Sequence, residues 1–419
     1  MGMETEFRQA RDWVRDNLDF SQVRGGISVF ETTIRNLGGL LSAYDLSRDK
    51  VFLRKADDLG MRLQQAFKSR TGIPYSEVEL FDGGRAYNTG WHSNYAILSE
   101  IGTLQIEFRY LARVTGKNEY ATDVMRALDQ LLKLNAESGL YPTFISNKQQ
   151  EPKFGNEDIS LGAMGDSFYE YLLKIWLQGG RKENKYRRRY DESVNGIMDK
   201  LIHMSRPSYL TYVAEMKRGR VVHKMDHLSC FLGGNLALGA YTHPDGLESL
   251  EAQRQLKTGK QLAYTCYQMY ARSKSGLAPE YVNFENARDD FKKGNAPYYI
   301  LRPETAETFY ILYHLTKDPV YREWGWEIFQ AIEEHCKTDA GYAAIQNVDT
   351  MKKNNRMESF FLAETLKYLF LLQDDTNDID LLNTVSGNDE MSVSLCFSRT
   401  LWIMYLLFFV FLLIDTACF

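Results

Sequence analysis

The chain has 419 residues, of which 25% are charged and 44% are hydrophobic, and its formal net charge is −5. This balance excludes a disordered tail and a coiled coil, and it gives no general attraction to nucleic acid or to an anionic membrane. Only 9 prolines stand against 30 glycines, which favours many helices joined by short connections.

The beginning of the chain does not resemble a secretory signal. Residues 1–20 mix charged and apolar side chains at helical spacing and lack the continuous apolar core that such a signal requires. We therefore expect no N-terminal signal anchor within them, and we expect a helix of the globular body instead.

Three segments share one pattern, in which a helix ends at a polar turn led by serine or threonine and a second amphipathic helix follows. The segments are residues 40–60, 108–128 and 309–329, and their turns are led by Ser47, Thr115 and Thr316. Their spacing indicates a unit of about 67 residues, with weaker copies near residues 180–181 and 244–245. About six helical hairpins then fit the chain, and a closed ring of hairpins buries one face of every helix. We expect an all-α toroid in which the first helix of each hairpin lines the centre.

Acidic residues recur near the start of these expected inner helices. They are Glu31, Glu100, Asp166, Glu304 and Glu307. Acidic residues favour the positive end of a helix macrodipole by about 0.3–1 kcal/mol each, so helix capping explains any one of them. As a set, in segments that otherwise have the composition of a core, they favour a shared pocket.

Local contexts sharpen this prediction. Glu31 and Arg35 are four residues apart and share a helical face, so an ion pair between them is the structural alternative. Glu304 follows a proline in the first turn of a helix, where the ionised carboxylate is favoured, as suits a general base. Phe360 and Glu364 place an aromatic ring beside a carboxylate on one face, an arrangement that a sugar ring would use.

Several carboxylates and aromatic side chains in a concave helical site suggest glycoside hydrolysis. In that reaction one carboxyl group protonates the leaving oxygen and another activates water or attacks carbon. A di-acidic metal site and a peptide-binding site are the alternatives. The sequence contains no HExxH, P-loop, GxSxG, GxGxxG or CxxC motif, so the usual metalloprotease, nucleotide, esterase and zinc-finger functions have no support.

Histidine and cysteine give weaker signals. His227 is flanked by apolar residues, and a lone histidine there is more often a hydrogen-bonded core residue than part of a site. The cysteines are Cys230, Cys266, Cys336, Cys396 and Cys418. Their wide spacing excludes a dense disulfide framework but permits one bridge, and buried free thiols are the alternative.

An uncharged apolar run, residues 401–414, lies near the end of the chain. A membrane-spanning helix needs about 20 such residues, so this run is shorter than a comfortable span. It predicts either a marginal tail anchor, through which the chain would associate with a membrane, or a buried or aggregation-prone segment.

A series of strings resembles, in order, the class I α-1,2-mannosidases of glycoside hydrolase family 47, which trim N-glycans in the endoplasmic reticulum and Golgi. They are FETTIRNLGGLLSAY, SEIGTLQIEF, GDSFYEYLLKIWLQGG, HKMDHLSCFLGGNLALG, SGLAPE, LRPETAETFY and MESFFLAETLKYLFLL, running from about residue 3 to residue 375. The resemblance implies an (α/α)7 barrel, an inverting mechanism, a calcium ion (Ca2+) at the base of the sugar site and high-mannose N-glycans as partners. It also implies the oxidising lumen of the Golgi or endoplasmic reticulum as the compartment.

The resemblance further implies roles for individual residues. The family's catalytic carboxylates match Glu31, Asp166, Glu280 and Glu304, with Glu304 as the base toward water and Glu31 or Asp166 protonating the leaving oxygen. Sugar-contacting positions match Arg35, Glu100, His227, Arg302, Phe360 and Glu364, and the family disulfide matches Cys230 with Cys266. Met164 stands where the Golgi form has an apolar residue and the endoplasmic reticulum form has arginine, which predicts broad trimming toward a five-mannose product.

Both ends depart from the family pattern. The chain starts inside a turn that follows an inner helix in the family, so we expect residues 1–375 to form a barrel domain that lacks one inner helix. Residues 376–419 are expected to form an atypical tail without the family's C-terminal plug strand. The calcium-binding threonine of that strand is not matched, because Asn383-Thr384 arrives about five positions early. We therefore assign no metal ligand, although the family implies a hard cation with oxygen donors.

Three functions follow from these observations. The leading prediction is a calcium-dependent glycoside hydrolase that removes terminal α-1,2-linked mannose during N-glycan processing in the secretory pathway. The alternative is a catalytically impaired, mannosidase-like lectin that binds glycans in glycoprotein quality control. A helical scaffold that binds peptides is the third hypothesis. Release of mannose would support the hydrolase, and glycan binding without release would support the lectin. The peptide-binding scaffold predicts neither result.

Overall fold

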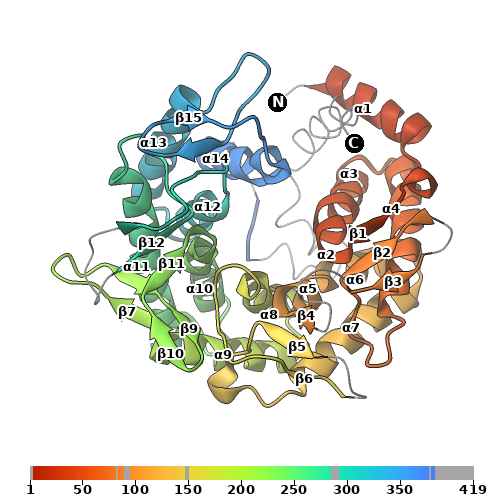
Figure 1. Ribbon diagram of the computed structural model, residues 1–419, viewed down its shortest axis with the longest axis horizontal. Coiled ribbons are helices and arrows are strands. Elements are labelled where there is room, and N and C mark those ends of the chain that lie inside the picture. Colours follow the sequence, from red (N-terminus) through yellow and green to blue (C-terminus); the bar gives the residue numbers. More distant parts are fainter. Residues whose placement is uncertain are drawn as a thin grey trace. The chain divides into compact units, whose positions relative to one another are not determined.

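A computed structural model describes residues 3–81, 84–88, 95–146, 151–284, 292–376 and 379–382 of the chain. The described residues fall into two compact units, whose elements are labelled in Figure 1. Unit 1 comprises the described residues within 3–159 and 167–192, and unit 2 comprises those within 160–166 and 193–382. The predicted domain boundary at residue 375 stays a prediction, and the predicted tail lies almost entirely outside the described residues.

Unit 1 combines helical hairpins with small antiparallel sheets. Its helices are α1 (Glu4–Asn17), α2 (Val29–Thr32), α3 (Gly38–Ser47), α4 (Lys50–Leu63), α5 (Leu98–Gly102), α6 (Gln105–Thr115), α7 (Asn118–Leu132), α8 (Asp166–Gln178) and the first half of α9 (Asn184–Lys200). One sheet has the order β1 (Gly26–Ser28), β2 (Glu77–Glu79), β3 (Ala86–Tyr87), and another has the order β4 (Tyr95–Ile97), β5 (Phe144–Ser146), β6 (Lys153–Phe154). The first residue of α8, Asp166, belongs to unit 2.

Unit 2 has the same kind of construction. Its helices are α10 (Phe231–Tyr241), α11 (Leu250–Ala271), α12 (Glu304–Thr316), α13 (Val320–His335) and α14 (Lys367–Gln373). Its strands pair as β7 (Ile202–Met204) with β8 (Thr211–Val213), β9 (Glu215–Lys217) with β10 (Arg220–Val222), β11 (Lys224–Asp226) with β12 (Tyr281–Asn283) and β13 (Lys292–Lys293), and β14 (Ile345–Asn347) with β15 (Lys352–Lys353).

The three predicted turns have the same hydrogen bonds. Ser47, Thr115 and Thr316 end α3, α6 and α12, and each hydroxyl donates to the carbonyl oxygen four residues earlier at 2.6–2.7 Å. Each hydroxyl oxygen also accepts the backbone N–H two residues later at 2.9–3.3 Å. The next residue in each case has a positive φ, of 56°, 74° and 58°, which stops the helix. The predicted helix-turn-helix repeat is therefore confirmed, and α8–α9 and α10–α11 supply the weaker copies.

The core of unit 2 centres on α10. This helix is apolar on all sides and its residues from Phe231 to Ala240 are buried, as expected of a helix that packs on several neighbours. It packs against α11 and α12. Each large aliphatic side chain buried in this way contributes roughly 1.5–3 kcal/mol relative to its exposed state.

A close approach and a covalent bond fix α11 against the start of α10. Gly233 and Gly259 meet where the helices cross, and a Cβ atom added at Gly259 would lie 2.6 Å from the carbonyl oxygen of Gly233. Cys230, in the 3₁₀ turn η7 (His227–Cys230), forms a disulfide with Cys266 of α11, with a Cα–Cα distance of 6.0 Å. The predicted pairing is therefore confirmed, and Cys336 is a buried free thiol.

The contact between α10 and α11 generates a stability prediction. Alanine at Gly259 would press its methyl group against backbone, which cannot move aside as a side-chain end can. We expect Gly259→Ala to lower the free energy of unfolding by about 1–3 kcal/mol despite the better helix propensity of alanine. Thermal unfolding followed by circular dichroism measures this as a decrease in Tm.

Gly38→Ala is the matched control in a helix of unit 1. A Cβ atom there would have its nearest neighbours at 3.6 and 3.7 Å, which is ordinary contact. The control should keep or raise Tm, because alanine gains up to about 1 kcal/mol over glycine in a helix. A Gly259→Ala protein as stable as the Gly38→Ala protein would show that the helix crossing is not tight.

Candidate active site

The start of α12 carries the carboxylate predicted to act as the general base. Pro303 precedes the helix, and its fixed φ and missing N–H suit a helix start. Glu304 is the first helical residue, so the positive end of the helix macrodipole favours its ionised form. Its side chain is 13% exposed, so most of it lies inside the protein.

His227 contacts the carboxylate of Glu304 through its ring. Its Nδ1 lies 3.0 Å from Oε2 of Glu304, and its Nε2 lies 2.7 Å from the hydroxyl of Tyr270 and 3.2 Å from that of Thr305. With Glu304 ionised, Nδ1 carries the hydrogen that it donates, and in the neutral ring the single lone pair of Nε2 accepts from the nearer hydroxyl, that of Tyr270. His227 is thus both a buried, hydrogen-bonded residue and a direct partner of the predicted base.

The surroundings of Glu304 set its protonation state. Burial alone would raise the pKa of this carboxyl group, but the hydrogen bond from His227 and the charge of Arg302 outweigh it, so the pKa lies below the usual range. Glu304 is therefore ionised at neutral pH, which is the state that a base requires.

Arg302 links several of the predicted acidic residues of unit 2. Its guanidinium group donates to both carboxylate oxygens of Glu280, through Nε at 2.7 Å and through Nη2. Nη1 lies 3.9 Å from Oε1 of Glu304, and the charge of Asp166 also favours the charged arginine. Although burial opposes it, the pKa of Arg302 is raised by the Glu280 hydrogen bonds and by these charges. A single fixed cation therefore serves several carboxylates.

Phe360 lies beside the same arginine, at the start of a distorted helix that also carries Glu364. The π-helical segment η9 (Phe361–Leu366) begins directly after Phe360 and contains Glu364. Arg302 Cζ lies 6.0 Å from the centroid of the Phe360 ring. Wider π-turns are frequent at functional sites, because they re-aim side chains that a regular α-helix would place elsewhere.

A second such distortion, in unit 1, follows directly after the helix that carries Glu31 and contains Arg35. Glu31 is capped by Ser28, whose hydroxyl accepts the Glu31 N–H at 3.2 Å, and Arg35 lies in the π-helical segment η2 (Thr33–Leu37). The Arg35 Nε donates to Glu31 Oε2 at 2.5 Å. The ion pair expected from their spacing is thus present, and 47% of the Glu31 side chain remains exposed.

Glu100 shares the electrostatic environment of Glu31. Burial raises the pKa of Glu100 to about 7, and the charges of Glu31 and of Glu77 on β2 add to this effect. Around neutral pH this carboxyl group therefore holds its proton for a large part of the time. Glu100 is in α5, directly after β4, and Glu31 is in α2, directly after β1. A short strand therefore helps to position each of these two acidic residues.

The predicted site residues divide between the two units. Unit 1 holds Glu31, Arg35 and Glu100, and unit 2 holds Asp166, His227, Glu280, Arg302, Glu304, Phe360 and Glu364. Within unit 2 the hydrogen bonds and charges above connect His227, Glu280, Arg302 and Glu304 directly. The catalytic and sugar-binding roles of all these residues stay predictions.

Several functional neighbours could not be identified in the sequence. Tyr270 and Thr305 complete the hydrogen bonding of His227, and Glu77 acts on Glu100 from a strand. Thr305 is adjacent to Glu304, but Tyr270 comes from α11 and carries no local signal. The two π-turns likewise have no signature in the helical periodicity.

The described residues show no metal cage. Among them, no group of three or more histidine, cysteine, aspartate or glutamate side chains is placed to hold an ion. The implied calcium ion stays a prediction, and no chemical step is assigned to calcium. Thr384 and the apolar run 401–414 lie outside the described residues. In the part of the chain that is described, no helix is long and apolar enough to cross a membrane.

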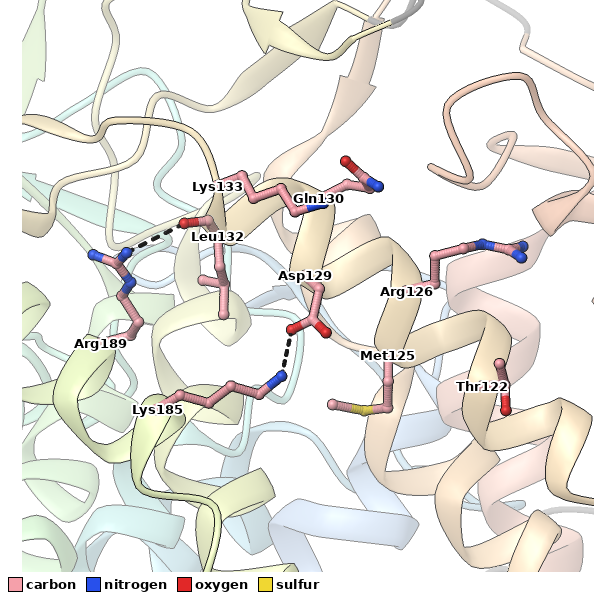
Figure 2. A pocket seen from close by; sticks show the side chains of 9 residues that line it. All are labelled: Thr122, Met125, Arg126, Asp129, Gln130, Leu132, Lys133, Lys185 and Arg189. Carbon is pink, nitrogen blue, oxygen red and sulfur yellow. Dashed lines mark hydrogen bonds and ion pairs between the residues drawn. The ribbon is translucent and has the colours of Figure 1, made fainter.

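A pocket of about 670 Å³ lies between α7 and α9 in unit 1 (Figure 2). Its basic lining residues include Lys185, whose Nζ lies 2.7 Å from Asp129 Oδ1, and Arg189, which donates to the carbonyl oxygen of Leu132 at 3.4 Å. The predicted site residues are not among those that line it. It has no part in the candidate active site.

Comparison with known sequences gives one consistent result. The sequence profile described as glycosyl hydrolase family 47 matches residues 1–388. Over 386 residues the chain is 43% identical to mannosyl-oligosaccharide alpha-1,2-mannosidase IA of Spodoptera frugiperda, covering 91% of this chain and 56% of the relative. It is 41% identical over 401 residues to the endoplasmic reticulum mannosyl-oligosaccharide 1,2-alpha-mannosidase of Rattus norvegicus, covering 93% of this chain and 59% of that protein. The chain thus spans little more than half the length of these relatives.

Comparison with solved structures agrees. The alpha-1,2-mannosidase from Trichoderma reesei matches with a TM-score of 0.82 at 29% sequence identity, covering 95% of this chain and 88% of that one. This match confirms the expected all-α class of the (α/α)7 barrel. Since the family profile spans nearly the whole sequence and the fold agrees with it, the chain belongs to glycosyl hydrolase family 47.

Proposed function

We propose that the protein is an inverting glycoside hydrolase that removes terminal α-1,2-linked mannose from high-mannose N-glycans. The observation that carries this proposal is Glu304, a carboxylate kept ionised inside the protein by His227 and Arg302 in a member of family 47. The names of the relatives, which are mannosyl-oligosaccharide 1,2-alpha-mannosidases, supply the substrate class.

In the proposed reaction Glu304 removes a proton from a water molecule. The oxygen of that water bonds to the anomeric carbon of the terminal mannose from the face opposite the leaving group, so the configuration inverts. The glycosidic C–O bond breaks, and the departing oxygen takes a proton from Glu31 or Asp166, directly or through water. Arg302 stays charged throughout, because its bonds to Glu280 stabilise the cation.

Unit 1 contributes a different chemistry. Arg35 fixes the carboxylate of Glu31 at 2.5 Å, and the raised pKa of Glu100, about 7, makes it a hydrogen-bond donor in mildly acidic conditions. A neutral carboxyl group and a fixed cation suit the hydroxyl groups of a sugar, which both donate and accept hydrogen bonds. We assign sugar binding to Arg35 and Glu100 on this basis.

The proposal includes the compartment. The Cys230–Cys266 disulfide suits an oxidising lumen, and relatives named for the endoplasmic reticulum agree with the secretory pathway. Calcium dependence stays a prediction from the family resemblance alone. The threonine that binds calcium in the family is not matched in this chain. If the site therefore binds glycan without hydrolysing it, the protein is a glycan-binding lectin. The measurements of mannose release and glycan binding below distinguish the hydrolase from the lectin.

Replacing the proposed base should abolish turnover while sparing binding. Glu304→Gln keeps the size of the side chain but cannot accept the proton, so we expect a loss in kcat of about 10²- to 10⁴-fold. Mannose release from a nine-mannose glycan in the presence of calcium measures turnover, and calorimetry measures glycan binding. Glu323→Gln on the exposed side of α13 is the matched control and should behave as the wild type. Retained turnover in Glu304→Gln would refute the assignment of the base, and wild-type binding without mannose release would favour the lectin.

The pH profile should report the hydrogen bond from His227. The base works only when deprotonated, so kcat/KM falls as the pH drops through the pKa of Glu304. His227→Ala removes a donor that lowers this pKa, and burial then raises it. The acidic limb should move to higher pH, and activity should recover as the pH increases. Measurement of kcat/KM between about pH 4 and 8 checks this, with His335→Ala on α13 as the control. An unchanged acidic limb would show that His227 does not lower the pKa of the base.

The product pattern should be broad. Met164, two residues before Asp166, adopts a positive φ of 74°, an unusual conformation for a side chain of this size. An apolar residue here makes no charged contact to one glycan branch, so we infer trimming toward a five-mannose product. Chromatography of the products from a nine-mannose glycan identifies the cleaved branches. A reaction that stops after one mannose would contradict this inference.

A further inference from the structure

A buried charge cluster in unit 2 lies beside the residues described above but is not part of them. Lys224 of β11 places its Nζ 3.0 Å from Glu215 Oε1 and 2.5 Å from Asp226 Oδ1. The two carboxylate side chains are only 8% and 12% exposed, and that of Lys224 is 21% exposed. The ammonium group also lies 4.8 Å from the centroid of the Tyr281 ring.

Two buried carboxylates need a counter-charge. Removing an ion from water costs several kcal/mol, and two like charges add their repulsion to that cost. Burial raises the pKa of Asp226 above its usual value, and the charge of Glu215 adds to this effect, although Lys224 opposes it. Lys217 also lies near this pair, 3.5 Å from Glu215 Oε2, but its side chain is 56% exposed, so its charge is well solvated. Among the side chains that the structure describes, Lys224 is therefore the principal counter-ion of both carboxylates.

These carboxylates contact the segment 160–166, which leads to Asp166. The Ser160 hydroxyl donates to Glu215 Oε1 at 3.4 Å and accepts the N–H of Gly162 at 3.0 Å. Gly162 packs directly on Asp226, because a Cβ atom added there would lie 2.2 Å from Asp226 Oδ2. The carbonyl oxygen of Gly162 then accepts the N–H of Asp166 at 3.0 Å. The segment thus contacts Glu215 through Ser160 and Asp226 through Gly162.

The residue that follows this strand contacts two more of the predicted carboxylate residues of unit 2, Glu280 and Glu304. His227 follows Asp226, and its backbone N–H donates to the carbonyl oxygen of Glu280 at 2.9 Å. Its ring binds Glu304, as described above. Asp226 is paired with Tyr281 in the ladder between β11 and β12, which fixes this register. Asp166, Glu280 and Glu304 are therefore all positioned from the end of β11.

We propose that Lys224 is a positioning residue for the reaction: it holds Glu215 and Asp226 together, and these two carboxylates fix the segment 160–166 and hence Asp166 in register with Glu280 and Glu304. This inference rests on the proposed hydrolase function. It predicts that the lysine acts on the rate of the chemical step more than on glycan affinity, because displacement of a catalytic group by about 1 Å costs up to about 10²-fold in rate.

Substitution of Lys224 tests the charge. Lys224→Met keeps a similar length without the cation, and kcat for mannose release should fall about 10- to 100-fold while KM changes less than about 3-fold. Lys224→Arg should retain activity within about 3-fold of the wild type. Lys217→Met removes the exposed cation near the same glutamate and should have no effect. Wild-type kcat in a folded Lys224→Met protein would overturn the proposal, and so would a loss of kcat that the arginine does not restore.

A second variant tests the contact without changing a charge. Gly162→Ala would push the segment away from Asp226, and it should lower kcat with little change in KM, as Lys224→Met does. This variant decides the question if Lys224→Met does not fold. Wild-type kcat in Gly162→Ala would overturn the role of the contact.

Hydrogen exchange separates this inference from the proposed hydrolase function. In the full chain, Lys224→Met should increase amide exchange in residues 160–166, including the N–H groups of Gly165 and Asp166, and Lys217→Met should not. If the wild type releases no mannose, the hydrolase proposal fails, and this exchange pattern still tests whether Lys224 orders the segment. Unchanged exchange in Lys224→Met would overturn the positioning role whatever the activity of the wild type.

Discussion

A carboxylate inside a folded protein must find a positive charge or a set of hydrogen-bond donors, because desolvation otherwise makes it take up a proton. In the described part of unit 2, Arg302 and Lys224 are the buried or half-buried cations that meet this constraint. Arg302 donates two hydrogen bonds to the carboxylate of Glu280, and its charge lowers the pKa of Glu304. Lys224 forms ion pairs with Glu215 and Asp226. Because the cations are held by the side chains that they neutralise, the acids and bases of this unit form connected groups rather than isolated charges.

This constraint explains why the secondary structure around the site is irregular. A regular helix has 3.6 residues per turn, so side chains on one face recur every three or four residues along its length. That spacing suits packing against a neighbour more than bringing several side chains to one point. The π-turns at η2 and η9 and the short strand β11 each place polar residues where a regular helix would not. Backbone irregularity of this kind lowers local stability, so it persists where surrounding packing fixes it, and η9 packs against α12 and α14.

Much of the fold followed from local sequence signals. Ser47, Thr115 and Thr316 predicted helix-turn-helix joints because a hydroxyl that binds both the preceding turn and the following N–H is a local device, readable from spacing. Glu304 was predictable as a first-turn residue from Pro303 for the same reason. The strands were not predicted, because each has only two or three residues, which is too short for an alternating pattern to appear.

The electrostatics of the site depend on contacts that are distant in sequence. Glu100 and Glu304 have the same side chain and both lie in the first turn of a helix, yet their pKa values move in opposite directions. The difference comes from neighbours: Glu31 and Glu77 add negative charge near Glu100, whereas His227 and Arg302 give Glu304 a donor and a positive charge. Local sequence shows only the helix start, so only the fold distinguishes a carboxyl group that keeps its proton from one that accepts it. Groups whose environments drive their pKa values apart are the ones that divide proton-donating and proton-accepting tasks. This criterion agrees with the proposal that Glu304 is the proton acceptor and that Glu100, which keeps its proton more readily, binds sugar hydroxyls.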